Sequence, residues 1–429
     1  MRLISVTAVL LMLFTTPGAQ AQSIILDKDE TRVFQKFIWV PYGFFSESFG
    51  LGLGVGGGFT GWPTEPASIF GAATIGTKGS YNIAVGMMDY QLPGIPRLVM
   101  EPIFVSGLYQ DQRVYVGRNP AFPNERSGSN GSHEDNFAEV RQWDNWAELR
   151  FRYLFPIGDG EENIVHKYVI DRGFLIRNPS GGESWNPLTG GRTRLSLTPG
   201  WRGQDLKNNE DREFPLKTVN LKIELEYDNR DFPFNATRGS SQILAYKQDF
   251  DNDERFGEWE AWTFDYNKLV NLGTSDRFRQ RVLALGFWTA YVPTWETRIE
   301  DGVEVVTRRP PYYEGAVLGG IYRMRAFEDS RWQDKASVFY SAEYRVVPNW
   351  QPLQNYDWLD FAAIQYWQWV VFAEAGQVAP HYNVGDLHDD LRFDAGFGLR
   401  GMLHTAVCRL DIAFGEEGSR VVAMYGQPF

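Results

Sequence analysis

The amino-acid sequence predicts an all-β protein, specifically a transmembrane antiparallel β-barrel of about sixteen strands. Segments with strict alternation of apolar and polar residues recur along the chain, and aromatic residues lie at the ends of many of them. Past the N-terminus, no stretch approaches the roughly 18 apolar residues that a membrane helix needs. With 429 residues, of which 43% are hydrophobic, the chain is long and apolar enough to fold.

The N-terminus is typical of a secretory signal peptide. Arg2 precedes an apolar run over 3–14, and Ala19-Gln20-Ala21 supplies a site with small residues for cleavage. We therefore expect a signal peptide over 1–22 and a short periplasmic segment over 23–49. One cysteine, Cys408, excludes an intramolecular disulfide, and a net charge of −12 makes nucleic acid an unfavourable partner.

The alternation is clearest over 221–228, where one face carries Leu221, Ile223, Leu225 and Tyr227 and the other only charged residues. Similar alternation occurs over 147–153, 337–346, 392–400 and 405–414. A soluble sandwich is the alternative, since its strands also have one polar face. Repeated charged faces, evenly spaced strands and aromatic strand ends favour a barrel with a wet interior and a lipid-facing exterior.

Fifteen strands are expected from the pattern, and single-chain bacterial barrels have an even number, so one more is expected within 97–120 or 163–178. The expected strands are 50–60, 68–77, 80–91, 97–110, 143–155, 191–202, 217–229, 239–249, 259–272, 278–293, 337–347, 368–376, 391–402, 405–414 and 421–429. The barrel would then span 50–429. Short links alternate with long polar ones, except for the link over 156–190, which does not fit this pattern.

The segment 226–239 resembles the D-x-R-D…N-P-T-x-G signature of the outer-membrane insertase or bacterial surface antigen superfamily, which includes the BAM and TAM barrels. Asp228, Arg230 and Asp231 are expected to satisfy one another beside the turn, and Gly239 permits a positive φ. Ala236 stands where the signature has proline.

The segment 318–327 resembles the V-R-G-F/Y motif of the same family, which lies at the tip of a long loop folded into the barrel lumen. The resemblance implies that Arg325 and Phe327 lie in the lumen, with Glu343 and Glu374 as partners of the arginine. The alternation independently assigns both glutamates to the polar face, and two carboxylates can hold a buried guanidinium. An equally open interpretation is that these are ordinary ion pairs that only fix the loop. Ala326 replaces the glycine of the motif.

The segment 421–429 resembles the last strand of the family, in which Gly426 and Phe429 would belong to the signal for the barrel-assembly machinery. The resemblance covers 50–429. It implies an integral protein of the bacterial outer membrane that assists protein or lipid insertion or translocation. Its partners would be outer-membrane lipid, the assembly machinery and unfolded outer-membrane proteins. Residues 23–49 are too few for a periplasmic polypeptide-transport-associated domain.

Other motifs do not predict an active site. The GxGxxG match within 50–58 has no helix after it and is expected to be the first strand, with Leu51, Leu53 and Val55 outward, beside the last strand. An acidic run over 249–260 has calcium-loop spacing but lacks the required glycine. We expect no catalytic residue, no metal and no cofactor. A passive channel or a structural surface protein is the alternative function, with the lumen charges setting conductance.

Overall fold

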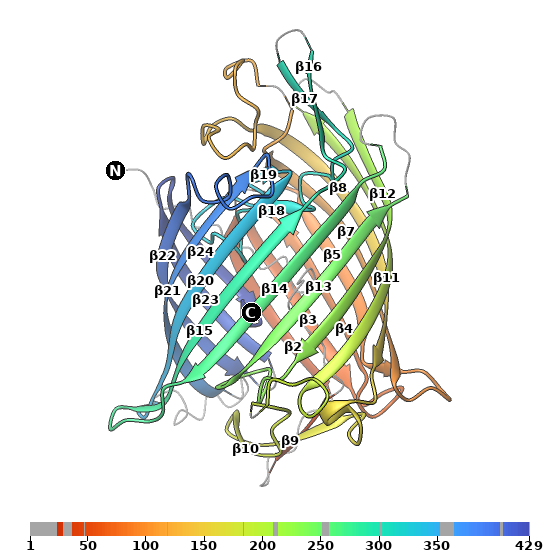
Figure 1. Cartoon of the computed structure of the whole chain (residues 1–429), viewed down its shortest axis with the longest axis vertical. Coiled ribbons are helices and arrows are strands. Elements are labelled where there is room, and N and C mark those ends of the chain that lie inside the picture. Colours follow the sequence, from red (N-terminus) through yellow and green to blue (C-terminus); the bar gives the residue numbers. More distant parts are fainter. Residues whose placement is uncertain are drawn as a thin grey trace.

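The computed structural model describes residues 24–28, 37–46, 48–117, 119–182, 184–208, 213–250, 257–300, 303–351, 364–403 and 406–428. These residues form a large antiparallel β-barrel (Figure 1). Its strands are β2 (Phe37–Ser46), β3 (Gly50–Thr60), β4 (Ser68–Gly76), β5 (Tyr81–Met88), β6 (Tyr90–Gln91), β7 (Leu98–Val114), β8 (Ala138–Leu154), β11 (Arg192–Asn208), β12 (Glu213–Asp228), β13 (Gly239–Asp249), β14 (Glu260–Asn271), β15 (Phe278–Tyr291), β20 (Ala336–Pro348), β21 (Ile364–Ala379), β22 (Arg392–Leu403), β23 (Ala406–Gly415) and β24 (Gly418–Tyr425). The short β6 continues the pairing of β5 along β7, so the wall is about sixteen strands around. The expected fold class is confirmed.

Successive barrel strands pair with each other in antiparallel register from β2 to β24. The links therefore gather at two ends of the barrel. Residues 115–137 and 292–335 lie at one end, called here the loop end, and short links such as 272–277 lie at the other, the turn end. Figure 1 shows the loop end at the top and the turn end at the bottom.

The alternation places side chains as the sequence predicts. Leu225, Val371 and Phe397 point outward and are 47%, 62% and 48% exposed, whereas Glu226 and Glu374 point inward and are buried. A continuous apolar exterior of this kind is stable when lipid covers it. Among the described residues, no helix is long and apolar enough to cross a membrane.

Three expectations about the strands were wrong. The barrel begins at β2, upstream of residue 50, and β2 is the strand missing from the sequence prediction. The segment 163–178 does not enter the barrel wall. The glycine-rich β3 is the second strand and not the first, because the upstream β2 pairs with it.

The inner face of β2 explains why the alternation missed it. This face carries Tyr42 and Phe44 in place of charges, and their rings cover the glycines of β3. A Cβ atom on Gly54 would lie 2.4 Å from the Tyr42 ring. The aromatic rings of one strand therefore occupy the space that glycine leaves in the next.

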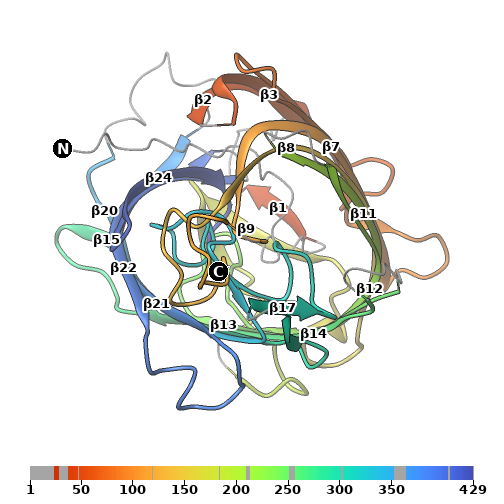
Figure 2. The ribbon, with the colours of Figure 1, turned by 90° about the horizontal axis from the view of Figure 1, so that it is seen from above.

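The link between β8 and β11 contains a turn of 3-10 helix, η1 (Gly158–Gly160), followed by β9 (His166–Asp171) and β10 (Phe174–Arg177). β9 pairs with β10 in antiparallel register and with β1 (Ile24–Lys28) in parallel register. We call these three strands the turn-end sheet. Figure 2 shows β1 and β9 inside the outline of the barrel, and Figure 1 shows β9 and β10 at the turn end.

The link 292–335, called here the lumen loop, fills the other end. Its hairpin of β16 (Glu296–Glu300) and β17 (Val303–Thr307) stands at the loop end (Figure 1). Its return segment carries β18 (Ala316–Leu318) and β19 (Trp332–Asp334), which pair with each other. The residues between β18 and β19 form the tip of the lumen loop.

Candidate functional site

The tip of the lumen loop is seated on the inner wall by apolar packing. Met324 and Phe327 are fully buried in a cluster that also contains Trp288, Phe339 and Phe372 of the wall. The Phe327 ring contacts Trp332 of β19, with ring centroids 4.6 Å apart. This packing fixes the loop tip on β20 to β23 and brings Arg325 to the charged residues of those strands.

Arg325 contacts three carboxylates that come from three different strands. Glu374 of β21 accepts hydrogen bonds from the backbone N–H of Arg325 at 2.8 Å and from its Nε at 2.9 Å. Asp411 of β23 accepts one from Nη1 at 2.7 Å, and Glu343 of β20 forms an ion pair with Nη2 at 2.9 Å. The Arg325 side chain has no exposed surface, and its guanidinium lies 3.5 Å from the centroid of the Phe372 ring.

Burial alone lowers the pKa of the Arg325 guanidinium, but attraction to Glu374, Glu343 and Asp411 outweighs it and raises the pKa. Arg325 is therefore charged at every physiological pH. A buried guanidinium with this many charge-assisted hydrogen bonds is held in one geometry.

Further charges surround this contact and balance it. Glu343 also accepts hydrogen bonds from Arg345 at 2.7 Å and from Arg400 at 2.7 and 2.9 Å. Arg409 donates to Asp411 at 3.3 Å, and Asp394 accepts from the backbone N–H of Ala326 at 2.9 Å. The resulting loop-lock cluster contains Arg325, Arg345, Arg400, Arg409, Glu343, Glu374, Asp394 and Asp411, all buried. Seven of these side chains have an oppositely charged partner within the cluster, and Asp394 is bound by the Ala326 N–H, so the charges can stay buried together.

Glycine at 398 makes room for the cluster. Gly398 lies opposite Asp411 in the pairing of β22 with β23. A Cβ atom on Gly398 would lie 2.1 Å from Oδ1 of Asp411, a distance that no side chain can occupy. The inward glycine of β22 is therefore what allows the Asp411 carboxylate to reach Arg325.

Ala326 is accommodated in place of the glycine of the motif. Met324, two residues earlier, has a positive φ of +58°, and Ala326 is not among the described residues with positive φ. Its side chain lies against Gly415, where an added Cβ atom would come within 2.9 Å of it. The neighbouring glycine thus supplies the space that alanine needs.

A second group of contacts ties the lumen loop to the strand ends and to the link 115–137. Arg331, which is fully buried, forms an ion pair with Glu417 at 2.8 Å and donates to the carbonyl of Ser132 at 2.6 Å. Arg420 of β24 donates to the carbonyl of Phe327 at 2.6 Å. The tip of the lumen loop is therefore held by the ends of the strands and by the link 115–137 as well as by the loop-lock cluster.

The turn signature is built around two aspartates. Asp228 accepts hydrogen bonds from Nε and Nη2 of Arg230, both at 2.9 Å. Asp231 binds the turn itself, accepting from the Thr237 N–H at 2.9 Å and hydroxyl at 2.6 Å. Gly239 has φ +103°, and a Cβ atom there would lie 2.3 Å from the carbonyl oxygen of Asn229. Asp231 therefore caps the turn through Thr237, beside the pair of Asp228 and Arg230.

The C-terminal residues are placed in part. Gly426 has φ +89°, and its N–H donates to the carbonyl of Val407 at 2.7 Å. Phe429 lies outside the described residues.

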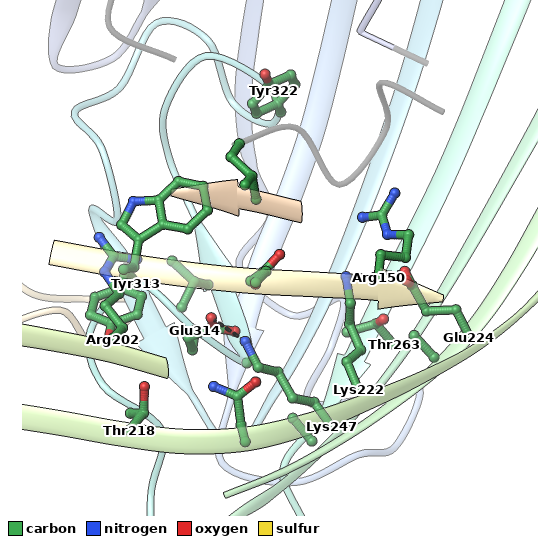
Figure 3. Close-up of a pocket in the computed structure, with 18 of the residues that line it drawn as sticks. Arg150, Arg202, Thr218, Lys222, Glu224, Lys247, Thr263, Tyr313, Glu314 and Tyr322 are labelled. Atoms are coloured by element: carbon green, nitrogen blue, oxygen red, sulfur yellow. Dashed lines mark hydrogen bonds and ion pairs between the residues drawn. The ribbon is translucent and has the colours of Figure 1, made fainter. Parts of the chain in front are cut away.

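A cavity of about 440 Å³ separates the lumen loop from the opposite wall. Figure 3 shows Lys247 of the wall directed at Glu314 of the loop, with Lys222 and Glu224 of the wall beside each other. Lys247 forms an ion pair with Glu314 at 2.6 Å and Lys222 with Glu224 at 3.2 Å. Within the described ranges no group of three or more His, Cys, Asp or Glu side chains has a metal-binding arrangement.

The structure brings together Arg325, Glu343 and Glu374, which the sequence had selected, and adds members that it had not. Sequence reasoning missed Asp411, Asp394, Arg345, Arg400 and Arg409 as partners. All five lie on the polar faces that the alternation identified, so a signal for their inward direction was present. Their mutual contacts depend on register across four strands, which alternation does not fix.

Comparison with known proteins identifies the family. Residues 148–421 match the Omp85 superfamily domain. No curated protein matches the sequence. Among solved structures, CdiB from Acinetobacter baumannii (11% identity, TM-score 0.50) and CdiB from Escherichia coli (10%, 0.50) are similar, covering 89% and 88% of this chain. BamA from Haemophilus ducreyi lacking POTRA domains 1–3 matches at 13% identity and TM-score 0.48 over 89% of this chain.

The chain spans 65%, 56% and 58% of the length of the BamA and the two CdiB chains, respectively. At these identities the likeness to the two CdiB structures shows the fold alone. The match to the family model covers most of the barrel, including the turn signature, the lumen loop and every member of the loop-lock cluster. This protein belongs to the Omp85 superfamily.

Proposed function

We propose that this barrel assists the insertion or translocation of polypeptides at the bacterial outer membrane, which it reaches after export directed by a signal peptide over 1–22. Membership of the Omp85 superfamily supports an insertase or translocator type of barrel. Its partners would be outer-membrane lipid on the apolar exterior, unfolded outer-membrane proteins as clients, and the barrel-assembly machinery, which would recognise Gly426 and Phe429 during biogenesis.

The observation that carries the proposal is the loop-lock cluster. Arg325 fixes the lumen loop on β20 to β23 through three buried carboxylates, so the loop occupies the lumen at this end. The turn-end sheet packs against the inner surface near the other end, where Tyr168 meets Tyr366 and Met402. A lumen that is occupied at both ends favours a role in inserting or translocating other polypeptides over free passage of solutes.

A passive channel is the second candidate, and the charged cavity favours it. Its wall of Lys222, Glu224 and Lys247 is polar and wide enough to hold water. In this alternative the lumen loop is a plug and the ion pairs set the conductance.

One reconstitution experiment separates the two. The purified protein is placed in phosphatidylethanolamine–phosphatidylglycerol liposomes, and a urea-denatured eight-stranded barrel protein is added. Folded client is followed by its shifted gel mobility, and steady conductance is recorded in planar bilayers of the same lipids. We expect folding several-fold faster than in liposomes with an equal mass of a sixteen-stranded porin, and little conductance. Porin-like conductance without faster folding would overturn the proposal and support the channel.

A further inference from the structure

The edge of β9 that pairs with β1 has the features of a polypeptide-binding site. All five residues of β1 pair with β9 in parallel, from Ile24 opposite His166 to Lys28 opposite Ile170. Ladder pairing of this kind is formed by main-chain groups and accepts many sequences. β1 comes from far upstream in the chain, so β9 already binds an extended segment that is not its neighbour in sequence.

β9 is anchored to the barrel by its own buried side chains. The side chains of Tyr168 and Ile170 are fully buried against Phe232, Tyr366 and Met402. Tyr168 and Phe232 have ring centroids 5.1 Å apart. The edge of β9 would therefore keep its position if β1 left.

The other edge of β9 is only partly paired. β10 pairs with residues 169–171 of β9, and a register shift interrupts this ladder between Leu175 and Arg177. Residues 166–168 have their described ladder partners in β1 alone. If β1 left, the edge of β9 that faces it would be open to another strand over 166–170, which is the usual basis of strand addition.

We infer that the β9 edge is an acceptor site for an extended client strand, which β1 occupies in the resting protein and from which a client displaces it. The client class, an unfolded outer-membrane protein, rests on the proposed function; the exchange of strands does not. The site lies at the turn end, at the mouth of the lumen (Figures 1 and 2).

Residues 29–36 tether β1 to β2, and this tether determines how concentrated a free peptide must be to displace β1. Residues 29–36 separate β1 from β2, so β1 stays within about 30 Å of the start of β2 even when fully extended. A tether of this length gives an effective concentration in the millimolar range. A free peptide should therefore bind weakly to the wild-type protein and at least tenfold more tightly once β1 cannot pair.

The test uses a fluorescein-labelled peptide with the sequence of residues 23–29, measured by anisotropy on the full chain in detergent. Ile25→Pro/Leu26→Pro prevents β1 from pairing, because proline removes ladder hydrogen bonds. Ile25→Cys/Lys167→Cys, on a Cys408→Ser background, joins opposite residues of β1 and β9 and locks β1 when oxidised. Heat-modifiable gel mobility verifies that each variant is folded, and a peptide with proline at its centre is the control.

We expect binding to the proline variant, binding at least tenfold weaker to the wild type, and none to the oxidised cysteine variant. Equal binding to all three, or no binding to a folded proline variant, would overturn the inference. A second peptide, with the sequence of residues 418–428, represents a client strand and should compete with the first. Its failure to compete would overturn the assignment to clients.

The liposome assay keeps this result separate from the proposed function. Peptide exchange without faster client folding would leave the acceptor site standing and remove the insertase role. Faster folding without peptide exchange would retain the insertase role and overturn the acceptor site alone.

Discussion

The lumen loop and the turn-end sheet both enter the barrel, but they are fixed by different kinds of contact. Arg325 of the lumen loop is held by directional, charge-assisted hydrogen bonds to Glu374 and Asp411. The turn-end sheet is held by apolar contacts such as Tyr168 against Phe232. Directional contacts tolerate one geometry, whereas apolar contacts depend mainly on buried area. The comparison indicates that charge-assisted hydrogen bonds hold the element at the loop end, whereas buried apolar area holds the one at the turn end.

Replacing Arg325 should have the largest effect on the barrel. Arg325→Met leaves Glu374 and Asp411 without their main cation inside the protein, and breaking a buried ion pair in this way costs about 3–5 kcal/mol. We expect a lower unfolding temperature in heat-modifiable gel mobility and faster proteolysis of the lumen loop.

Arg308→Met is the matched control from the same loop. Arg308 pairs with Glu296 at 3.0 Å, but the two side chains are 49% and 42% exposed. Exposed pairs contribute at most about 1 kcal/mol, so this variant should behave like the wild type. Equal unfolding temperatures for the two variants would show that the loop-lock cluster does not stabilise the loop.

Replacing Phe232 tests the apolar contact and should affect a smaller part of the molecule. Phe232→Ala removes a fully buried ring from beneath Tyr168, a change that costs about 3–5 kcal/mol in a packed core. Because the turn-end sheet is small, we expect it to open locally while the barrel stays folded. Limited proteolysis should then cut the link 155–191 faster with unchanged heat-modifiable mobility.

Trp185→Ala is the control for this change, since Trp185 lies in the same link and is 81% exposed. It should leave proteolysis of the link unchanged. If Phe232→Ala instead lowered the unfolding temperature as much as Arg325→Met, the two contacts would belong to one cooperative unit, and the comparison would fail.

The same contrast explains what the sequence predicts and what it does not. The contacts of Arg325 with Glu343 and Glu374 follow from a motif combined with alternation, because alternation states which way a strand residue points. The contact of Asp411 with Arg325 also needs Gly398 opposite Asp411. That pairing depends on the register of β22 and β23. The register is determined by the whole barrel and cannot be predicted from the sequence of any one segment.

The turn-end sheet is even harder to predict from the sequence. β1 and β9 are far apart in sequence and pair in parallel, and neither carries a turn signal that points to the other. β2 is a related case, since its inward Tyr42 and Phe44 conceal the alternation that marks the other strands. Non-local pairing and aromatic lumen packing are therefore the parts that local patterns could not supply.

The smallest expected effect is a pH dependence of the turn-end sheet. His166 of β9 is buried, and burial lowers the pKa of its imidazole below 6.5, with Arg192 acting in the same direction and the Asn178 carbonyl and Asp159 opposing. Above about pH 6.5 the ring is neutral whether the sheet is docked or open. Below that value the open state binds the proton first, so docking weakens as the pH falls.

We therefore compare the proteolysis rates of the link 155–191 in the wild type and in His166→Gln. The ratio of the wild-type rate to the variant rate should rise as the pH falls from 8 to 5. Taking this ratio cancels the pH response of the protease, and a constant ratio would show that His166 does not contribute to docking.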